Sequence, residues 1–428
     1  MKWIVDYGLL GSFERQELLF HKVLPFFLEG AHIFVFALHE RLSLEQEDFL
    51  EGLFPSKIPV IMKAESIEAL QDLYDDYKGF ETIPGLANMI FYQGICQRAS
   101  DIHFEPLETS GRIRLRIDGE LYTFKEIPLH IWKGLINRIK ILSKLRLDET
   151  KRPQMGRHSV FFHHKEIDLR FSSHPTIFGE SIVVRILDKH LKPLNLQELE
   201  FEEGFCRELS SLLKIPYGLI IFTGPTGSGK TTTLFALLNQ LNTPAINIMT
   251  LEDPVEYILE GAKQTEIKPG TLEEFNEGIR SILRQDPDVI LIGEMRDEET
   301  ARMAFRAAMT GHKVFSTLHA NTAFQVIQRL TDLGLPLNLI SGNLKGIISQ
   351  RLVRKIAPQS ASGFLGRIPI GEIIKIDETL DEMIARGDSI HAMEKYALSQ
   401  NFVPLKEYAM NLARKNLTTL QEIEKAVL

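Results

Sequence analysis

The feature that most constrains the fold of this chain is a glycine-rich segment, Gly224-Pro225-Thr226-Gly227-Ser228-Gly229-Lys230-Thr231. It satisfies the pattern G-x-x-x-x-G-K-[ST], which requires a buried strand before it and a helix after it. Apolar residues 219–223 precede the segment, and residues 231–241 have a helical pattern. The sequence therefore predicts a strand, a phosphate-binding loop and a helix in succession; the alternative is a glycine-rich turn that matches by chance.

The chemistry of this loop points to a nucleoside triphosphate. Its backbone N–H groups can surround phosphates, and the N-terminus of the next helix adds a partial positive charge. We expect Lys230 to reach the β- and γ-phosphates and the Thr231 hydroxyl to bind Mg²⁺, with Thr232 completing the nucleotide-binding set. The segment thus predicts binding and hydrolysis of ATP with magnesium.

Carboxylates follow two other predicted strands. Residues 289–292 are apolar and lead through Gly293 to Glu294, a candidate base that polarises water. Many ATPases carry a magnesium-binding Asp where this chain has Gly293, so the metal needs another carboxylate. Glu252 or Asp253, after residues 246–251, is the candidate. The alternative for each acid is a helix N-cap or a solvated loop charge.

Two histidines flank a further predicted strand, residues 314–317. His312 precedes it and His319 follows it, so they lie at opposite edges of the sheet. Only His319 is placed near the γ-phosphate, although a lone histidine is more often a structural group.

The order of elements around these motifs predicts the fold. Strands alternate with helical stretches at residues 271–284 and 299–309, which favours a largely parallel sheet covered on both faces. We expect a RecA-like α/β ATPase domain over residues 205–428, helical from about residue 336 onward.

Two further domains are expected before it. Residues 85–195 combine a helical stretch with strands in which Ile113, Leu115 and Ile117 alternate with arginines, which predicts a small mixed α/β, PAS-like domain with one apolar and one basic face. Residues 1–80 carry no chemical motif, and we interpret them as a docking or regulatory domain.

The overall composition limits which classes of binding partner and which cellular location are expected. The net charge of −8 and a pI near 6.0 disfavour a nucleic acid as the main partner. The chain has two cysteines, Cys96 and Cys206, in no C-x-x-C pair, and no signal peptide or membrane-spanning stretch is apparent. We expect a cytoplasmic protein with peripheral contact to the inner face of the membrane.

From residue 85 onward the chain resembles the secretion ATPases of type II secretion systems and type IV pilus assembly. The resemblance rests on four ordered boxes and on second-domain motifs. Besides the phosphate-binding loop, the boxes are Thr250-Leu251-Glu252-Asp253-Pro254-Val255-Glu256, Gly293-Glu294-Met295-Arg296-Asp297, and Ser316-Thr317-Leu318-His319-Ala320-Asn321. The second-domain motifs include Ala99-Ser100-Asp101-Ile102-His103-Phe104-Glu105-Pro106 and Gly179-Glu180.

The resemblance implies roles for particular residues. Glu294 would be the catalytic glutamate, His319 a γ-phosphate sensor, and Glu252 part of the acidic box. Arg170 and Arg185, on strands of the second domain, would reach ATP as arginine fingers; a solvated strand face is the alternative. The family works as ring hexamers that act on a polytopic inner-membrane platform protein, with an adaptor as a further partner of the N-terminal domain.

Two departures from the family pattern bear on function. Only residues 355–366 stand where most assembly members carry a four-cysteine zinc insertion, so we expect no zinc site. Met155 stands where the family usually has an acid. In lacking the insertion, the chain resembles retraction ATPases. In having an N-terminal region and the segment Thr418-Thr419-Leu420, it resembles the assembly branch. The alternatives are a retraction motor, a DNA-uptake or nucleic-acid translocase, and a catalytically silent scaffold.

Overall fold

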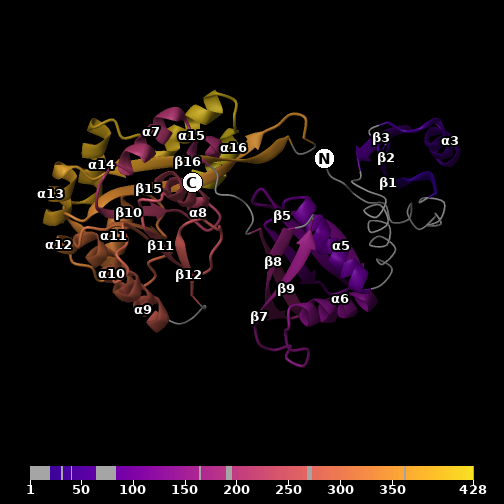
Figure 1. Cartoon of the computed structure of the whole chain (residues 1–428), viewed down its shortest axis with the longest axis horizontal. Coiled ribbons are helices and arrows are strands. Elements are labelled where there is room, and N and C mark those ends of the chain that lie inside the picture. Colours follow the sequence, from indigo (N-terminus) through magenta and orange to yellow (C-terminus); the bar gives the residue numbers. More distant parts are fainter. Residues whose placement is uncertain are drawn as a thin grey trace. The chain divides into compact units, whose positions relative to one another are not determined.

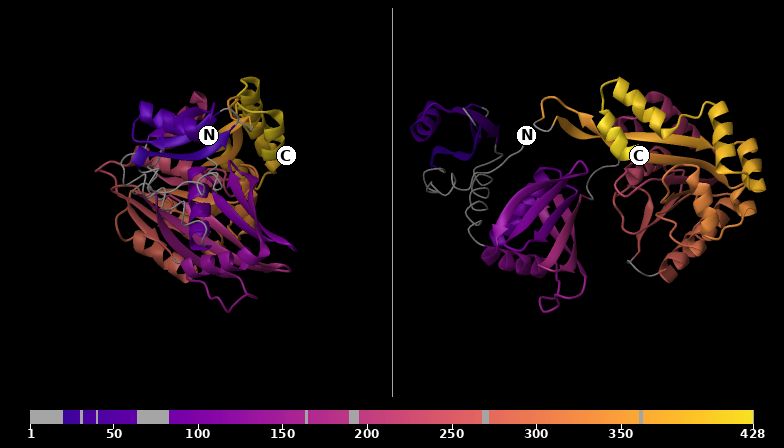
Figure 2. Two further views of the ribbon diagram at one scale, coloured as in Figure 1. Left: turned by 90° about the vertical axis from the view of Figure 1, so that its right-hand side faces the viewer. Right: turned by 180° about the vertical axis from the view of Figure 1, so that it is seen from behind.

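The computed structural model describes residues 20–29, 32–39, 41–63, 83–162, 165–188, 195–267, 272–360 and 363–427. The chain divides into two compact units, Met1–Leu187 and Asp188–Leu428. Figure 1 labels most of their elements, and Figure 2 shows the same ribbon from two further sides. The boundary between the units precedes the predicted start of the ATPase domain at residue 205, and each unit is described below by itself.

The first unit contains a small sheet near its N-terminal end. Strand β2 (His32–Ala37) pairs antiparallel with β1 (Val23–Glu29) and parallel with β3 (Ile58–Lys63), and α3 (Leu44–Leu53) lies between β2 and β3 in the sequence. Ser43 and Gln46 form a capping box at the start of α3. Ile33, Val35 and Leu50 form the core of this part.

The described residues of the first unit from 83 onward form a six-stranded antiparallel sheet with two helices. The strand order is β6-β5-β4-β9-β8-β7. Its elements are α5 (Ile83–Cys96), β4 (Asp101–Pro106), β5 (Ser110–Ile117), β6 (Glu120–Pro128), α6 (Leu129–Leu142), β7 (Gln154–Phe162), β8 (Lys165–Thr176) and β9 (Gly179–Leu187). Both helices contribute to the core that covers one face of the sheet, with Phe91, Trp132 and Leu135 among the buried side chains. The sequence therefore predicted a mixed α/β arrangement here correctly.

On the opposite face of this sheet, the arginines of β5 form ion pairs with neighbouring acids. The three arginines of β5 each lie within 4 Å of a carboxylate: Arg112 near Glu126, Arg114 near Glu105, and Arg116 near Asp101. Directly opposite residues on neighbouring strands share a face, so acids and bases pair across the strands. The arginines of β5 therefore line one face as predicted, and acids of the neighbouring strands, which the pattern of β5 alone did not reveal, pair with them.

The second unit is built on a seven-stranded sheet of order β12-β11-β13-β14-β10-β15-β16 within the described residues. All neighbours are parallel except β15 and β16, which are antiparallel. The strands are β10 (Gly218–Thr223), β11 (Ile248–Glu252), β12 (Lys263–Glu266), β13 (Val289–Ile292), β14 (Lys313–Leu318), β15 (Leu344–Ile356) and β16 (Phe364–Lys375). Consecutive parallel strands are usually joined by helical crossovers, which places helices on both faces. Strands β11 and β12 are joined instead by residues 253–262, which contain no helix.

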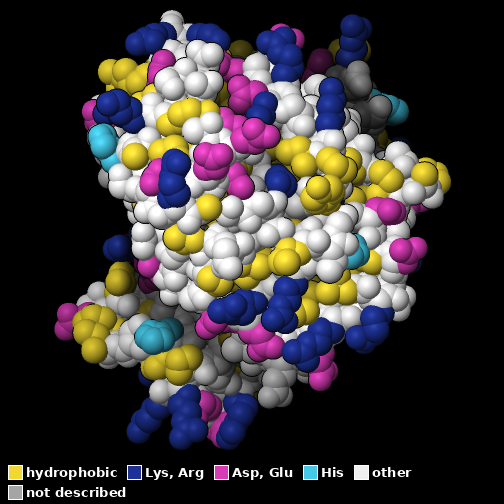
Figure 3. Space-filling view, turned by 90° about the vertical axis from the view of Figure 1, so that its left-hand side faces the viewer, with side chains coloured by type: hydrophobic (Ala, Val, Ile, Leu, Met, Phe, Trp, Pro, Cys, Tyr) yellow, Lys and Arg dark blue, Asp and Glu magenta, His cyan; other side chains and the backbone are white. Residues whose placement is uncertain are grey.

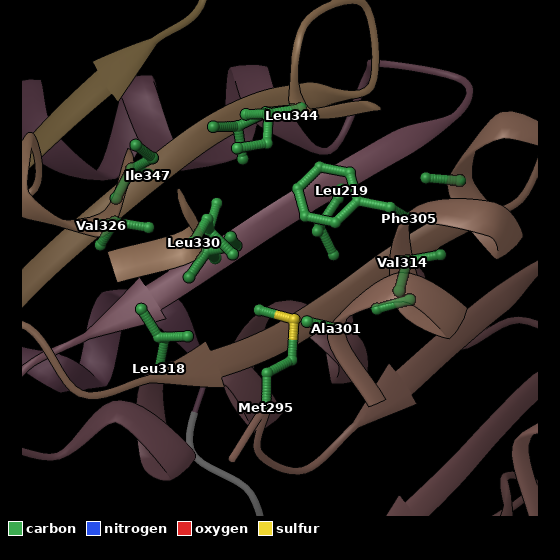
Figure 4. Close-up of a cluster of buried hydrophobic side chains, with 14 of the residues drawn as sticks. Leu219, Met295, Ala301, Phe305, Val314, Leu318, Val326, Leu330, Leu344 and Ile347 are labelled. Carbon is green, nitrogen blue, oxygen red and sulfur yellow. The ribbon is translucent and has the colours of Figure 1, made fainter. Parts of the chain in front are cut away.

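Alternating side chains of β10 point into two separate cores. Leu219 and Ile221 belong to one hydrophobic cluster, and Ile220 and Phe222 to the other. Figure 4 shows the first cluster, in which Leu219 lies among side chains such as Phe305. That face is covered by α9 (Leu272–Ile282), α10 (Glu298–Met309), α11 (Gln325–Asp332), α12 (Leu337–Ile340), α13 (Glu378–Arg386) and α14 (Ile390–Ser399). The other is covered by the 3₁₀ helix η2 (Leu196–Leu199), α7 (Glu203–Leu212), α8 (Lys230–Leu241), α15 (Leu405–Arg414) and α16 (Leu420–Val427).

The prediction that residues from about 336 onward are helical is wrong for residues 344–375. These residues form the long hairpin of β15 and β16, and β15 pairs with the central strand β10. Residues 346–350 of β15 are all buried, as expected of a strand covered on both faces. Such a short apolar run does not distinguish a buried strand from a buried helix in the sequence.

The surface has a mixed composition. On the face drawn in Figure 3, basic and acidic side chains lie close together, with hydrophobic ones between them. Exposed apolar atoms of this kind are normal for folded proteins. Within the described residues, no helix is both long enough and apolar enough to span a bilayer.

Candidate active site

The glycine-rich loop joins the carboxyl end of β10 to the first turn of α8, as its sequence predicted. Gly227 and Gly229 have φ of 77° and 84°, a left-handed backbone that glycine adopts without strain. Gly224 has φ 143°, and a Cβ there would lie 2.3 Å from the backbone oxygen of Gln350. The close approach of two backbones therefore requires glycine at position 224.

The loop has the polar groups that a triphosphate needs. The Lys230 Nζ donates to the carbonyl oxygens of Gly224 at 2.7 Å and of Pro225 at 3.0 Å, so the ammonium lies across the loop. Burial lowers the pKa of Lys230 to about 8, and the carboxylate of Glu294 opposes that shift. The buried Ser228 Oγ has no hydrogen-bond partner. A group rich in negative oxygens would satisfy these donors, so the residues fit a bound nucleotide.

Glu294 and His319 lie next to each other at the carboxyl ends of β13 and β14. The His319 Nε2 is 3.2 Å from Glu294 Oε1, and its Nδ1 is 3.2 Å from the carbonyl oxygen of Gly224. Both ring nitrogens thus face acceptors, and a protonated ring would donate to both. Arg296 donates from Nε to Glu294 Oε2 at 2.9 Å. The carboxylate is therefore held from two sides beside the phosphate-binding loop.

Glu252 lies at the end of β11 and is buried, with 4% of its surface exposed. Its Oε1 accepts from Thr250 Oγ1 at 2.6 Å and from Gln264 Nε2 at 3.1 Å. Burial raises the pKa of Glu252 to about 7, against the effect of these two hydrogen bonds. Asp253, the next residue, is 3.4 Å from Arg296 and is linked through it to Glu294.

The structure offers few protein ligands for a metal ion. In the part of the chain that it describes, no group of three or more His, Cys, Asp or Glu side chains is arranged to hold one. Thr231 is the second residue of α8 and is half-buried. Magnesium commonly keeps several waters and is bound through substrate phosphates with few protein ligands, so this sparse set is compatible with it.

The other predicted site residues lie elsewhere. His312, at the amino end of β14, hydrogen-bonds through Nδ1 to Ala307 O and Thr310 Oγ1, both at 3.0 Å. In the first unit, Arg170 and Arg185 face each other across β8 and β9. Arg185 donates to Asp101 Oδ1 at 3.1 Å and its side chain is 57% exposed.

A second group of side chains, which no sequence motif predicts, comes from the β15–β16 hairpin. Gln350 donates from Nε2 to Ser228 O at 2.9 Å, and Arg351 donates from NH2 to Asn321 O at 2.6 Å. No motif in the sequence connects Gln350 with Ser228, 122 positions earlier, or Arg351 with Asn321, 30 positions earlier. Gln350 reaches the phosphate-binding loop because β15 pairs with β10.

Comparisons with known proteins place this geometry in context. Residues 76–425 match the family described as "Type II/IV secretion system protein". The chain is 45% identical over 334 residues to the "Putative type II secretion system protein E" of Escherichia coli strain K12, covering 74% of this chain and 68% of that protein. It is 34% identical over 401 residues to the "Type IV pilus assembly ATPase TfpB" of Acinetobacter baylyi, covering 84% and 68%.

A solved structure supports the fold and the use of nucleotide. The pilus retraction motor PilT with bound ADP is 29% identical, with a TM-score of 0.57 over 79% of this chain and 95% of that chain. The predicted α/β ATPase core is thereby confirmed.

Proposed function

Because the chain belongs to the type II/IV secretion system protein family and is an ATPase, we propose that it is a hexameric motor. In this proposal, ATP hydrolysis powers the assembly of a type IV pilus or a type II secretion pseudopilus through an inner-membrane platform protein. The names of the E. coli and A. baylyi relatives support both systems. The observation that carries the catalytic part is the contact of Glu294 with His319 beside the phosphate-binding loop.

We propose that the chemical step is attack of water on the γ-phosphate. Glu294 accepts the proton of the water, and its position at the carboxyl end of β13 supports this role. Lys230 neutralises charge on the β- and γ-phosphates, and His319 contacts the γ-phosphate. Nucleotide would displace the Lys230 ammonium from the carbonyls of Gly224 and Pro225, to which it donates in the present structure.

Magnesium, bound by Thr231, would supply further neutralisation of the triphosphate charge. The Oε1 atom of Glu252 already accepts two hydrogen bonds, which leaves its second oxygen for the metal. A water-bridged contact through its second oxygen accommodates that geometry.

Arg170 and Arg185 are proposed as the arginines that neutralise the charge developing in the transition state. The side chain of Arg185 is mostly exposed. Little free energy is therefore lost when Arg185 leaves its ion pair with Asp101 to contact a phosphate. Their strands belong to the first unit and the phosphate-binding loop to the second. Movement of one unit against the other would then couple hydrolysis to mechanical work.

A retraction motor is the second candidate. The connection between β15 and β16 is short and carries no cysteine, and the retraction motor PilT shares the fold. The two directions are distinguished in cells that express this chain as their sole motor. Growth of fibres would support an assembly motor, and loss of existing fibres would support a retraction motor.

The proposed motor is tested by ATP turnover with magnesium as a function of protein concentration, with the oligomeric mass recorded alongside. We expect turnover to rise as hexamer forms. Arg185→Ala should reduce kcat by about a hundredfold or more while ADP still binds, because an arginine finger contributes mainly in the transition state. Arg112→Ala is the matched control, since Arg112 lies on the same sheet face and pairs with the exposed Glu126.

Two results would contradict these assignments. Full ATP turnover by a stable monomer would contradict the proposal that the active motor is a hexamer. Equal losses of kcat in Arg185→Ala and Arg112→Ala would mean that the sheet, and not one arginine, is responsible.

A further inference from the structure

The loop that follows β14 is held at successive residues by side chains of three other strands. Thr223 of β10 both donates to Ala320 O, at 3.0 Å, and accepts from Ala320 N, at 2.8 Å. Arg351 of β15 donates to Asn321 O. Glu372 of β16 accepts from Ala323 N at 2.8 Å. Since this loop begins with His319, its conformation fixes where the imidazole lies.

Glu372 differs from the other two anchors because it holds a second element. Its Oε1 accepts from Ala323 N, and its Oε2 accepts from Leu405 N at 2.9 Å. Leu405 is the first residue of α15, whose N-cap, Pro404, provides no side-chain cap. The helix packs against β16, beside which Figure 1 also shows it.

The Glu372 carboxylate is buried and therefore needs compensating hydrogen bonds or charges. Glu372 is 5% exposed, so a carboxylate there must be stabilised by its neighbours. Burial raises the pKa of Glu372, whereas the two backbone N–H groups and the charge of Arg351 lower it. Ala323 lies just before α11 and Leu405 begins α15, so the carboxylate lies near the N-termini of two helices, where a negative charge is favoured.

We propose that Glu372 is a positioning residue for ATP hydrolysis: it fixes the His319 loop and ties the position of that loop to the start of α15. This inference rests on the proposed role of His319. The carboxylate itself lies behind the loop and acts through the backbone of residues 319–323. A change in the loop on nucleotide binding is then transmitted to α15 through one side chain.

The test compares Glu372→Gln, His319→Ala and the double variant in the full-length protein, by steady-state ATP turnover. Glutamine keeps the shape of the side chain, but its NH₂ group meets a backbone N–H donor, so one of the two hydrogen bonds is lost. We expect kcat to fall about tenfold in Glu372→Gln, with KM for ATP within about threefold. The double variant should be no slower than His319→Ala alone, because residues that act as a unit are not additive.

Glu422→Gln is the matched control for a loss of stability alone. Glu422 is another buried carboxylate of this unit, 7% exposed, but it pairs with Arg354 and not with the His319 loop. The control should lower the melting temperature at least as much as Glu372→Gln, while kcat stays within about twofold. A direct readout is amide exchange: Glu372→Gln should speed exchange at whichever of Ala323 and Leu405 faces the glutamine NH₂ group and so loses its acceptor.

Three outcomes would overturn the inference. Multiplicative losses in the double variant would show that Glu372 acts independently of His319. Equal kcat losses in Glu372→Gln and Glu422→Gln would reduce its role to stability. Unchanged turnover in His319→Ala would remove the proposed role of His319 itself, which separates failure of that proposal from failure of Glu372.

Discussion

Replacing Glu294 by glutamine tests its proposed role as general base while leaving the other side chains of the site in place. Glutamine has nearly the same shape and still accepts one hydrogen bond from Arg296 or His319, but it cannot take a proton from water. Positioned general bases contribute about 10²–10⁴-fold to rate, so we expect kcat to fall about a thousandfold, equivalent to about 4 kcal/mol.

The same geometry predicts what should not change. The side chain of Arg296 is 61% exposed, and ion pairs with such exposed partners contribute only about 0–1 kcal/mol to stability. The free energy of unfolding should therefore change by less than about 1 kcal/mol. ADP affinity should stay within about threefold, because the groups proposed to bind phosphate belong to the loop between β10 and α8.

The assay is phosphate release from Mg-ATP at saturating nucleotide, with ADP binding by calorimetry on the same samples. Glu298→Gln is the matched control: this carboxylate also pairs with an arginine, the half-buried Arg302, at 2.7 Å, but lies on the first turn of α10. Its kcat should stay within about twofold of the wild type. Retention of more than a tenth of wild-type turnover by Glu294→Gln would refute the assignment of Glu294 as the base.

Two further predictions concern stability. Gly224→Ala should lower the free energy of unfolding by about 2–4 kcal/mol, because its Cβ meets the carbonyl of Gln350 at 2.3 Å, whereas Gly227→Ala, with nothing within 4 Å, should cost only the left-handed strain of about 1–2 kcal/mol. Urea unfolding without nucleotide measures both, and equal losses would contradict the steric argument. The Arg354 hydrogen bonds lower the pKa of Glu422, so its contribution is fully present above the unfolded pKa of about 4.3 and is lost as pH falls through the lower folded pKa. The stability gap between wild type and Glu422→Gln, about 2 kcal/mol at neutral pH, should therefore narrow below about pH 4 in thermal melts; a constant gap down to pH 2 would contradict this linkage.

The sequence predicted the central part of the fold because its signals there are local. A glycine-rich loop between an apolar strand and a helix needs particular residues at adjacent positions, and β10 and α8 formed within a residue of the predicted bounds. The predicted strand at residues 289–292 has the bounds of β13. Because carboxyl ends of parallel strands meet at one edge, the proximity of Glu294 and His319 also followed from strand order.

The hairpin of β15 and β16 could not be recognised in the same way. Its apolar residues have no period that separates a buried strand from a helix, and its pairing with β10 is decided by packing on both faces of the sheet. The arginines of β5 posed the same difficulty. Their alternation was visible, but the acids opposite them come from neighbouring strands.

The sequence by itself determined the phosphate chemistry, because Lys230, Thr231 and the glycines act through neighbours in the chain. Only the tertiary structure decided what holds that chemistry in place. Gln350, Arg351 and Glu372 carry no motif, and their contacts join residues 30–122 positions apart. The physical reason is that a hydrogen bond to a loop backbone depends on where a strand packs, which the local sequence of that strand does not reveal.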